Sequence, residues 1–310
     1  MKETAGKTLF IVNPVSSNGR GLTEWNLIKK RLNDWTNNFD VRITKFAMEA
    51  VQITSEALRN GYKHIIVVGG DGTLNEVING FYQDDKVINP GAFLSVVPAG
   101  TGCDFARMFN IKVNRDYIVR ILSGGKEKTC DVARATFIGL NQEKSVRYFI
   151  NAGDVGMGSE TVARVNRNSK VLGGFWSFLL AALFTALTYK NRQIKVKIDE
   201  QEIYSGPCCL IAVANGQYFG GGMRIAPRAS IDDGYLDVIL VKNIGKIDLM
   251  SNLFRVYKGN HLTHPKIKMF RGQKINVFSR DQIYLELDGE TAGQGDVEFE
   301  ILPQRIKLLV

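Results

Sequence analysis

A short apolar segment followed by a polar, glycine-containing loop and then a helical segment occurs three times in the first half of the chain. The apolar segments are Thr8–Val12, His64–Val68 and Phe93–Val97, and the loops that follow them read NPVSSNGRG, GGDGT and PAGTG. Strands that alternate with helices are typical of a parallel α/β sheet. Since the crossovers of such a sheet place the carboxyl ends of its strands at one edge, we expect the three loops to lie together.

Length and composition set wider bounds. A chain of 310 residues suggests about two domains, and 45% hydrophobic residues are enough for a sizeable core. The net charge of +9 favours anionic partners, namely nucleotides, nucleic acid or an acidic membrane surface. The 4 cysteines contain no CxxC pair and the 3 histidines complete no obvious zinc set, so we expect reduced thiols in a cytosolic protein.

From about Cys130 onward, strand patterns replace the alternation and helices become few. The predicted strands are Asp131–Phe137, Arg147–Ala152, Ile194–Ile198, Cys208–Asn215, Tyr235–Val241, Lys274–Phe278 and Ile283–Asp288. This pattern predicts a second, mainly antiparallel β domain, a sandwich or a barrel. We place the first domain at residues 1–128 and the second at 129–301, and the final strand over 302–310 is a candidate to return to the first domain.

One segment of the β half, Gly173–Tyr189, contains no charged residue and is flanked by Lys170, Lys190 and Arg192. It predicts a helix with three alternative roles. A spanning helix needs about 20 apolar residues, so a transmembrane role is the least favoured. Otherwise the helix is buried in a core, or it lines an apolar ligand site or touches a membrane surface, where the flanking cations would contact acidic headgroups.

The glycine-containing loops carry residue types that bind phosphate. The glycines of GGDGT allow backbone amides to approach a ligand closely, and a helix that begins at about Leu74 adds free N–H groups. Asp71 is suited to hold Mg²⁺ beside phosphates, and Thr73 either caps the helix or binds a phosphate oxygen. Any one loop is also explained as a simple turn, but three on one sheet edge predict a shared phosphate site. Neither the Walker pattern GxxxxGK[ST] nor the dinucleotide pattern GxGxxG occurs.

Four motifs together resemble the diacylglycerol kinase catalytic-domain family, in its soluble bacterial lipid kinase branch. They are GGDGTLNEVING, PAGTGCDFAR, NGQYFGGGMRIAPRASIDDGYLDVILV and LDGE, and they follow the family's order. The resemblance implies an α/β plus β fold like that of NAD kinases and diacylglycerol kinases. An N-terminal doubly wound parallel-sheet domain would bind ATP, and a C-terminal antiparallel β-sandwich domain would receive the lipid substrate.

The resemblance also assigns binding residues by matching positions. Nucleotide contacts would come from Asn13, Ser17, Thr44, Gly69, Gly70, Asp71, Gly72, Thr73, Leu74, Asn75 and Thr101. A structural Mg²⁺ site would use the Asp233 carboxylate with the backbone carbonyls of Ser230 and Tyr235. From the residues alone, the segment IDDGYLDV is equally explained as a β-turn.

The motif LDGE would supply the catalytic acidic pair, in which either Asp288 or Glu290 takes the proton from the lipid hydroxyl, with Asp71 organising metal and phosphate. Without the resemblance, LDGE reads as a tight hairpin turn. One departure from the family is Cys103, which stands where the family has Asn. A thiol is a weak hydrogen-bond partner and cannot replace an amide. Its position at a predicted helix N-terminus leaves a reactive and an inert thiol open.

The sequence therefore predicts a kinase that uses ATP and Mg²⁺ to phosphorylate a hydroxyl of diacylglycerol or a related lipid. The alternatives are a lipid- and nucleotide-binding module that has lost catalysis, suggested by Cys103, and an NAD kinase, which shares GGDGT. We expect a cytoplasmic protein, peripheral to the inner face of the membrane, with a lipid as its partner and a homodimer left open. No nucleic acid partner is expected, because no recognised nucleic-acid motif occurs. No residue indicates which lipid is used.

Overall fold

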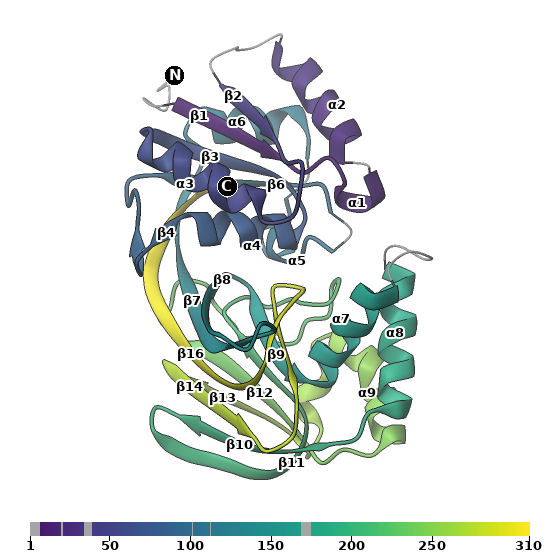
Figure 1. The fold of residues 1–310 in the computed structure, drawn as a ribbon. Coiled ribbons are helices and arrows are strands. Elements are labelled where there is room, and N and C mark those ends of the chain that lie inside the picture. Colours follow the sequence, from purple (N-terminus) through teal and green to yellow (C-terminus); the bar gives the residue numbers. More distant parts are fainter. Residues whose placement is uncertain (1–6, 20, 34–38, 101, 112, 169–174) are drawn as a thin grey trace. The chain divides into compact units, whose positions relative to one another are not determined.

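The structure, a computed structural model, describes residues 7–19, 21–33, 39–100, 102–111, 113–168 and 175–310. The chain divides into two compact units, each described by itself below (Figure 1). The first unit comprises Met1–Cys130 and Gln304–Val310, and the second unit comprises Asp131–Pro303. The C-terminal residues therefore belong to the same unit as the N-terminal ones.

Strands alternate with helices in the first unit. Its elements in chain order are β1 (Lys7–Val12), α1 (Ser16–Gly19), α2 (Gly21–Asn33), β2 (Asp40–Ile43), α3 (Glu49–Arg59), β3 (Tyr62–Gly69), α4 (Asp71–Gly80), β4 (Tyr82–Gln83), β5 (Lys86–Val87), β6 (Phe93–Pro98), α5 (Asp104–Arg107) and α6 (Arg115–Leu122). Strands β2, β1, β3 and β6 lie side by side in that order and run parallel. The end of β16 (Glu290–Leu309) adds a further parallel strand beside β6, where Lys307 pairs with Phe93 and Leu308 with Leu94.

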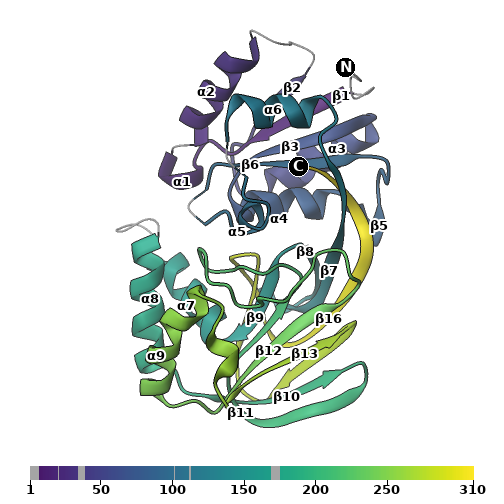
Figure 2. The same ribbon diagram turned by 180° about the vertical axis from the view of Figure 1, so that it is seen from behind.

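Continuous apolar runs make these strands the centre of the first unit. Such runs are typical of parallel strands that are covered on both faces. Alternate residues of β1 and β3, such as Phe10 and Ile66, share a buried cluster with side chains of α2 and α6. Figure 2 shows these two helices beside β1. The Phe10 ring lies 5.1 Å from the Trp25 ring of α2. Helices α3 and α4 pack against each other and against β3.

Three local predictions in the first unit differ from the structure. The segment NPVSSNGRG, predicted as a loop, contains the single helical turn α1. Helix α4 begins at Asp71 rather than at Leu74, because a carboxylate is favourable in the first turn of a helix. The helix predicted over Cys103–Phe109 is only the four residues of α5, and the chain turns at Asn110, whose φ is +50°.

Antiparallel strands and the helices α7, α8 and α9 make up the described part of the second unit. Its elements are β7 (Glu127–Gly139), which enters from the first unit, then β8 (Lys144–Phe149), β9 (Ala152–Gly156), α7 (Met157–Asn168), α8 (Phe175–Thr188), β10 (Arg192–Ile198), β11 (Gln201–Ala214), β12 (Leu236–Lys242), α9 (Lys246–Tyr257), the 3₁₀ turn η1 (His261–Thr263), β13 (Ile267–Gly272), β14 (Lys274–Ser279), β15 (Tyr284–Leu287) and β16. The order β13-β12-β11-β10-β14-β16 forms one path of strands, and β9 pairs with both β11 and β15.

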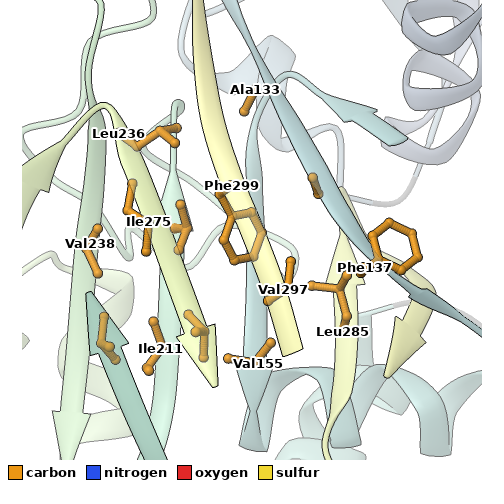
Figure 3. Close-up of a cluster of buried hydrophobic side chains, with 14 of the residues drawn as sticks. Ala133, Phe137, Val155, Ile211, Leu236, Val238, Ile275, Leu285, Val297 and Phe299 are labelled. Carbon is orange, nitrogen blue, oxygen red and sulfur yellow. The ribbon is translucent and has the colours of Figure 1, made fainter. Parts of the chain in front are cut away.

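Alternation along β11 divides the second unit into two cores. Ile211 and Val213 belong to a strand core, formed by residues of β7 to β12 and β14 to β16 (Figure 3). Leu210 and Ala212 belong to a helix core, which includes Met157 of α7, Ala186 of α8 and the packed side chains of α9. Since successive side chains of a strand point to opposite faces, one strand supplies both cores.

The helices of the second unit were only partly foreseen. Helix α8 lies within the predicted apolar segment, whose first residues are outside the described part of the chain, while α7 and α9 were not predicted (Figure 1). The predicted strand Arg147–Ala152 is divided between β8 and β9, with a break at Ile150 and Asn151. Within the described ranges, no helix combines the length and the apolar character needed to cross a bilayer.

Removal of the Phe299 side chain should destabilise the second unit. Phe299 is fully buried in the strand core (Figure 3). Its ring centroid lies 5.8 Å from that of Phe149. We expect Phe299→Ala to lower the free energy of unfolding by about 3–5 kcal/mol, because it leaves a cavity. Phe254→Ala, at a phenylalanine that is 61% exposed on α9, is the control and should change it by less than about 0.5 kcal/mol. Denaturant unfolding measures both, and equal effects would contradict the assignment of the core.

Candidate functional site

The strands of the first unit end level with one another, and this brings the predicted loops to one edge. The amide of Thr44, after β2, donates to the Val12 carbonyl at 2.9 Å, and the amide of Asn13, after β1, donates to the Val68 carbonyl at 3.0 Å. On the other side of β3, the Ala99 amide donates to the Gly69 carbonyl at 2.9 Å. The residues that follow β2, β1, β3 and β6 are therefore neighbours, as the strand and loop pattern indicates.

Direct contacts join the loops at this edge. Asn13 Nδ2 donates to Thr73 Oγ1 at 2.9 Å, which links the first loop to the first turn of α4. A Cβ atom at Gly100 would collide with the Cα atom of Gly70, so these two loops touch through their backbones. This close approach requires glycine, and it keeps the backbone amides at the start of α4 near the sheet edge.

Asp71 connects two of the loops through its carboxylate. Its Oδ2 accepts from the Asp104 amide at 3.0 Å, and its Oδ1 accepts from the Phe105 amide at 3.1 Å. Burial raises the pKa of Asp71, and these backbone donors oppose that shift. The amide of Asp71 itself is a third donor, and an ionised carboxylate offers about four acceptor sites, so one remains for a cation that would stabilise the charge. The residues at this edge therefore fit a Mg²⁺ ion that accompanies phosphate.

Cys103 takes part in the same set of contacts. Its φ of +49° is left-handed, a conformation that asparagine adopts more readily than other non-glycine residues. The Gly100 amide donates to Cys103 Sγ at 3.1 Å. Burial, together with the nearby Asp71 carboxylate, raises the pKa of the Cys103 thiol to about 12. Of the two alternatives for this thiol, the inert one is therefore favoured.

The other residues predicted to contact the nucleotide differ in how exposed they are. Ser17, in α1, and Gly72, at the start of α4, are half-buried at the edge. The side chains of Leu74 and Asn75 are buried inside the unit, so only their backbone groups face the loop end of the helix. Thr101 lies outside the described residues.

In the second unit, LDGE forms the tight turn between β15 and β16. Leu287 pairs with Glu290, and both central residues have positive φ, +48° at Asp288 and +91° at Gly289. An Asp-Gly pair is the preferred sequence for a two-residue hairpin turn of this handedness. LDGE can therefore form a hairpin turn and also supply an acidic pair to a site.

The two acidic residues of this turn have different surroundings. Asp288 is 5% exposed, and its carboxylate accepts from three consecutive amides, those of Ile150 at 3.0 Å, Asn151 at 3.0 Å and Ala152 at 3.1 Å. These bonds occupy Asp288 at the break between β8 and β9. Glu290 is exposed at the start of β16. The arrangement separates an anchoring carboxylate from one that is exposed to solvent.

Sequence reasoning missed several polar residues near this turn. Asn151 Nδ2 donates to the Tyr218 carbonyl, and Asn215 Nδ2 donates to the carbonyls of Asp131 and Ile150. Two buried carboxyl groups, Asp154 and Glu286, lie directly beneath the turn. Asn215 is the first residue of the motif NGQYFGGG, so the sequence offered a signal for it. The pairing of Asp154 with Glu286 depends on strand register, which the sequence does not indicate.

At the predicted structural metal site, the Asp233 carboxylate lies beside a cationic side chain. Asp233 forms an ion pair with Arg271, and its Oδ1 accepts from the Tyr235 amide at 3.1 Å. The Ser230 hydroxyl donates to Asp232 Oδ1 at 2.7 Å. Arg271 supplies positive charge beside Asp233, and the Mg²⁺ site formed by this carboxylate with the backbone carbonyls of Ser230 and Tyr235 stays a prediction. Among the described residues, no three His, Cys, Asp or Glu side chains gather in a way that could hold a metal ion.

Family models match both halves of the chain. Residues 7–135 match the diacylglycerol kinase catalytic domain, and residues 153–310 match the YegS C-terminal NAD kinase beta sandwich-like domain. The two matches place the first glycine-containing loops in one family domain and the LDGE turn in the other.

Individual relatives agree with these matches. A diacylglycerol kinase of Staphylococcus carnosus is 28% identical over 265 residues, which cover 86% of this chain and 82% of that protein. A solved structure of a candidate diacylglycerol kinase from Bacillus anthracis str. Sterne is 25% identical with a TM-score of 0.75, and the match covers 99% and 98% of the two chains. An NAD kinase from Archaeoglobus fulgidus, solved in complex with ATP, shares the fold at a TM-score of 0.51 and 12% identity, over 98% and 93% of the chains. The chain thus belongs to the lipid kinase family in which a diacylglycerol kinase catalytic domain is followed by a YegS-type β-sandwich domain.

Proposed function

We propose that this protein transfers the γ-phosphoryl group of ATP to a hydroxyl group of diacylglycerol or a related lipid. The observation that carries the proposal is that the two acidic residues of the LDGE turn have different surroundings, in a chain that belongs to a lipid kinase family. Asp288 is held by backbone amides, and Glu290 is exposed beside it. We assign residues 1–128, with the final strand 302–310, as the doubly wound ATP-binding domain and residues 129–301 as the lipid-binding domain.

The first unit supplies the phosphate-binding half of the reaction. The N–H groups in the first turn of α4 lack acceptors within the helix, and the positive end of the helix dipole favours phosphate oxygens. Asn13 and Thr73 offer further polar groups at the same edge. Mg²⁺ that arrives with ATP would neutralise phosphate charge, and Asp71 would hold it while also fixing the start of α5.

The second unit supplies the group that accepts a proton. As the lipid hydroxyl attacks the phosphoryl group, it must lose its proton to a nearby base. Glu290 is the exposed carboxylate of the turn, and Asp288 fixes the position of the turn without being available itself. We therefore assign Glu290 as the base and Asp288 as a positioning residue.

Helix α8 offers an apolar face for the lipid. Leu180, Phe184 and Leu187 are each more than half exposed, and their spacing places them on one side of the helix. The guanidinium of Arg164 lies 5.2 Å from the Phe184 ring, and Lys190 follows the helix. Apolar side chains edged by cations are typical of helices that rest on an acidic membrane surface. We propose that this face contacts the membrane that contains the substrate.

The contacts of Cys103 argue against a module that has lost catalysis. Although the thiol replaces an amide, it accepts the Gly100 N–H and occupies the left-handed position that joins the loops. The loop geometry is thus retained at the site of the departure. An NAD kinase would transfer the phosphoryl group to NAD and not to a lipid, so the identity of the acceptor distinguishes this alternative from the proposal.

Transfer of label from γ-labelled ATP tests the proposal. The purified protein would be incubated with Mg²⁺ and mixed micelles that contain diacylglycerol, monoacylglycerol, a sphingoid base or phosphatidylglycerol, with NAD as a competing acceptor. Label in a lipid, lost in Asp71→Ala, supports a lipid kinase and names its substrate class. Label in NAD alone, or ATP binding without transfer to any acceptor, would overturn the proposal.

Glu290→Gln should remove the base while it keeps the shape of the turn. We expect kcat to fall by about 10²–10⁴-fold and KM for ATP to stay near its wild-type value, because the change affects proton transfer. Glu298→Gln, further along β16 in an exposed ion pair with Lys274, is the matched control and should keep full activity. Steady-state kinetics with the lipid identified above measure the effect, and a kcat of Glu290→Gln within twofold of wild type would exclude Glu290 as the base.

Cys103→Asn should stabilise the protein and preserve its activity. Asparagine tolerates the left-handed φ better than cysteine, so we expect the free energy of unfolding to rise by about 0.5–1 kcal/mol. Cys103→Ala keeps the unfavourable φ and removes the acceptor for Gly100 N–H, so it should lower stability. Urea unfolding compares the three proteins. The strain argument fails if the asparagine variant is less stable than the alanine variant.

A further inference from the structure

Two buried carboxyl groups face each other beneath the LDGE turn. Asp154 on β9 and Glu286 on β15 are direct partners in the antiparallel register, so their side chains emerge on the same face. Their exposures are 0% and 3%. Two carboxylates at such positions repel each other strongly, so the pair needs a further explanation.

Each carboxyl group uses one oxygen to hold a backbone amide. Asp154 Oδ1 accepts from the Ser159 amide, in the first turn of α7, at 2.6 Å. Glu286 Oε1 accepts from the Gly289 amide, in the turn that carries Glu290. The pair therefore lies between the start of α7 and the candidate catalytic turn.

The remaining oxygens point to a shared proton. Asp154 Oδ2 and Glu286 Oε2 are buried and have no hydrogen-bond partner among the described residues, and the two carboxyl groups are close enough for each to affect the pKa of the other. Two acceptor oxygens can bond only with a proton between them. Gly158 leaves the space for this contact, because a Cβ atom there would collide with the Asp154 carboxyl group.

Burial favours retention of that proton. It raises the pKa of Asp154 to about 7 and raises the pKa of Glu286 well above its ordinary value. The titratable groups that face the pair are acidic as well, namely Asp288 of the turn, near Glu286, and the Cys209 thiol of β11, near Asp154. Helix α7 contributes the amide and the hydroxyl of Ser159.

We infer that Asp154 and Glu286 share a single proton and act as positioning residues that fix the turn carrying Glu290 to the start of α7. The inference rests on the proposed function only where activity is the readout. Four oxygens in this arrangement serve as three acceptors, two for backbone amides and one within the pair, and as one donor. Loss of the last proton would leave two facing carboxylates, and the turn and α7 would separate.

Substitution of either carboxyl group by an amide tests whether the pair has three acceptors and one donor. In Glu286→Gln, the amide oxygen accepts from Gly289 and the amide nitrogen donates to Asp154, so all groups stay paired. Asp154→Asn is paired in the same way. The double variant has two oxygens and two nitrogens, and whichever way the amides turn, one acceptor is lost. We expect each single variant to keep kcat within about twofold of wild type, and the double variant to lose about 100-fold through displacement of Glu290.

The pH dependence of unfolding is the readout that does not need activity. Because both groups have raised pKa values in the folded state, the unfolded state binds fewer protons, and the pair's contribution to stability is lost as pH rises from about 4 through these raised pKa values, which for Asp154 is about 7. We expect Tm of the wild type to fall with pH across this window. Tm of either single variant should fall less steeply, and Glu202→Gln, at an exposed residue of β11, should follow the wild type.

The outcomes distinguish this inference from the proposed function. A double variant no worse than the two single variants combined, or single variants with the pH dependence of the wild type, would overturn the shared proton. If the pair positions the turn, kcat of the wild type should decline at alkaline pH, and single variants with the same decline would overturn the positioning role. A wild type that phosphorylates no lipid would remove the proposed function alone, because the unfolding measurements would still decide how the pair is protonated.

Discussion

The carboxylate of Asp288 accepts hydrogen bonds from three consecutive backbone amides, and the position of the LDGE turn in the second unit depends on these bonds. They explain why the chain breaks between β8 and β9, since the amides of Ile150 to Ala152 turn toward the carboxylate. The dependence is mutual, because buried amides need acceptors as much as a buried carboxylate needs donors. A hairpin turn, which is ordinarily one of the more mobile parts of a sheet, is in this way held as firmly as the strands around it.

The first unit uses the same device. In GGDGT, as in LDGE, an aspartate beside glycine directs its oxygens to the amides of a segment distant in the sequence, here the start of α5. Glycine allows the backbone to turn sharply, and the carboxylate then joins the turn to its neighbour. Both motifs therefore contain a glycine, which makes the backbone flexible, and an aspartate, whose carboxylate then fixes the backbone in place. An aspartate in this role can organise a site without touching the reacting atoms.

The sequence contains most of the fold but only part of the site. Apolar runs with glycine loops predicted the strands of the first unit, because burial on both faces leaves a continuous hydrophobic signal. Helices α7 and α9 were missed because polar residues interrupt their apolar pattern. The candidate nucleotide edge was foreseen because its residues follow strands directly. The ion pair of Asp233 with Arg271 and the pairing of Asp154 with Glu286 were not, because both depend on which strands become neighbours and in which register.

Adjacent cysteines on β11 show a further result of the division into two cores. Cys208 belongs to the strand core and Cys209 to the helix core, so the two thiols leave the backbone on opposite faces. Burial raises the pKa of both, and the pKa of Cys209 reaches about 12. Neither thiol can be modified unless β11 separates from the core on its side. Modification of Cys208 would therefore report the opening of the strand core, and modification of Cys209 would report the opening of the helix core.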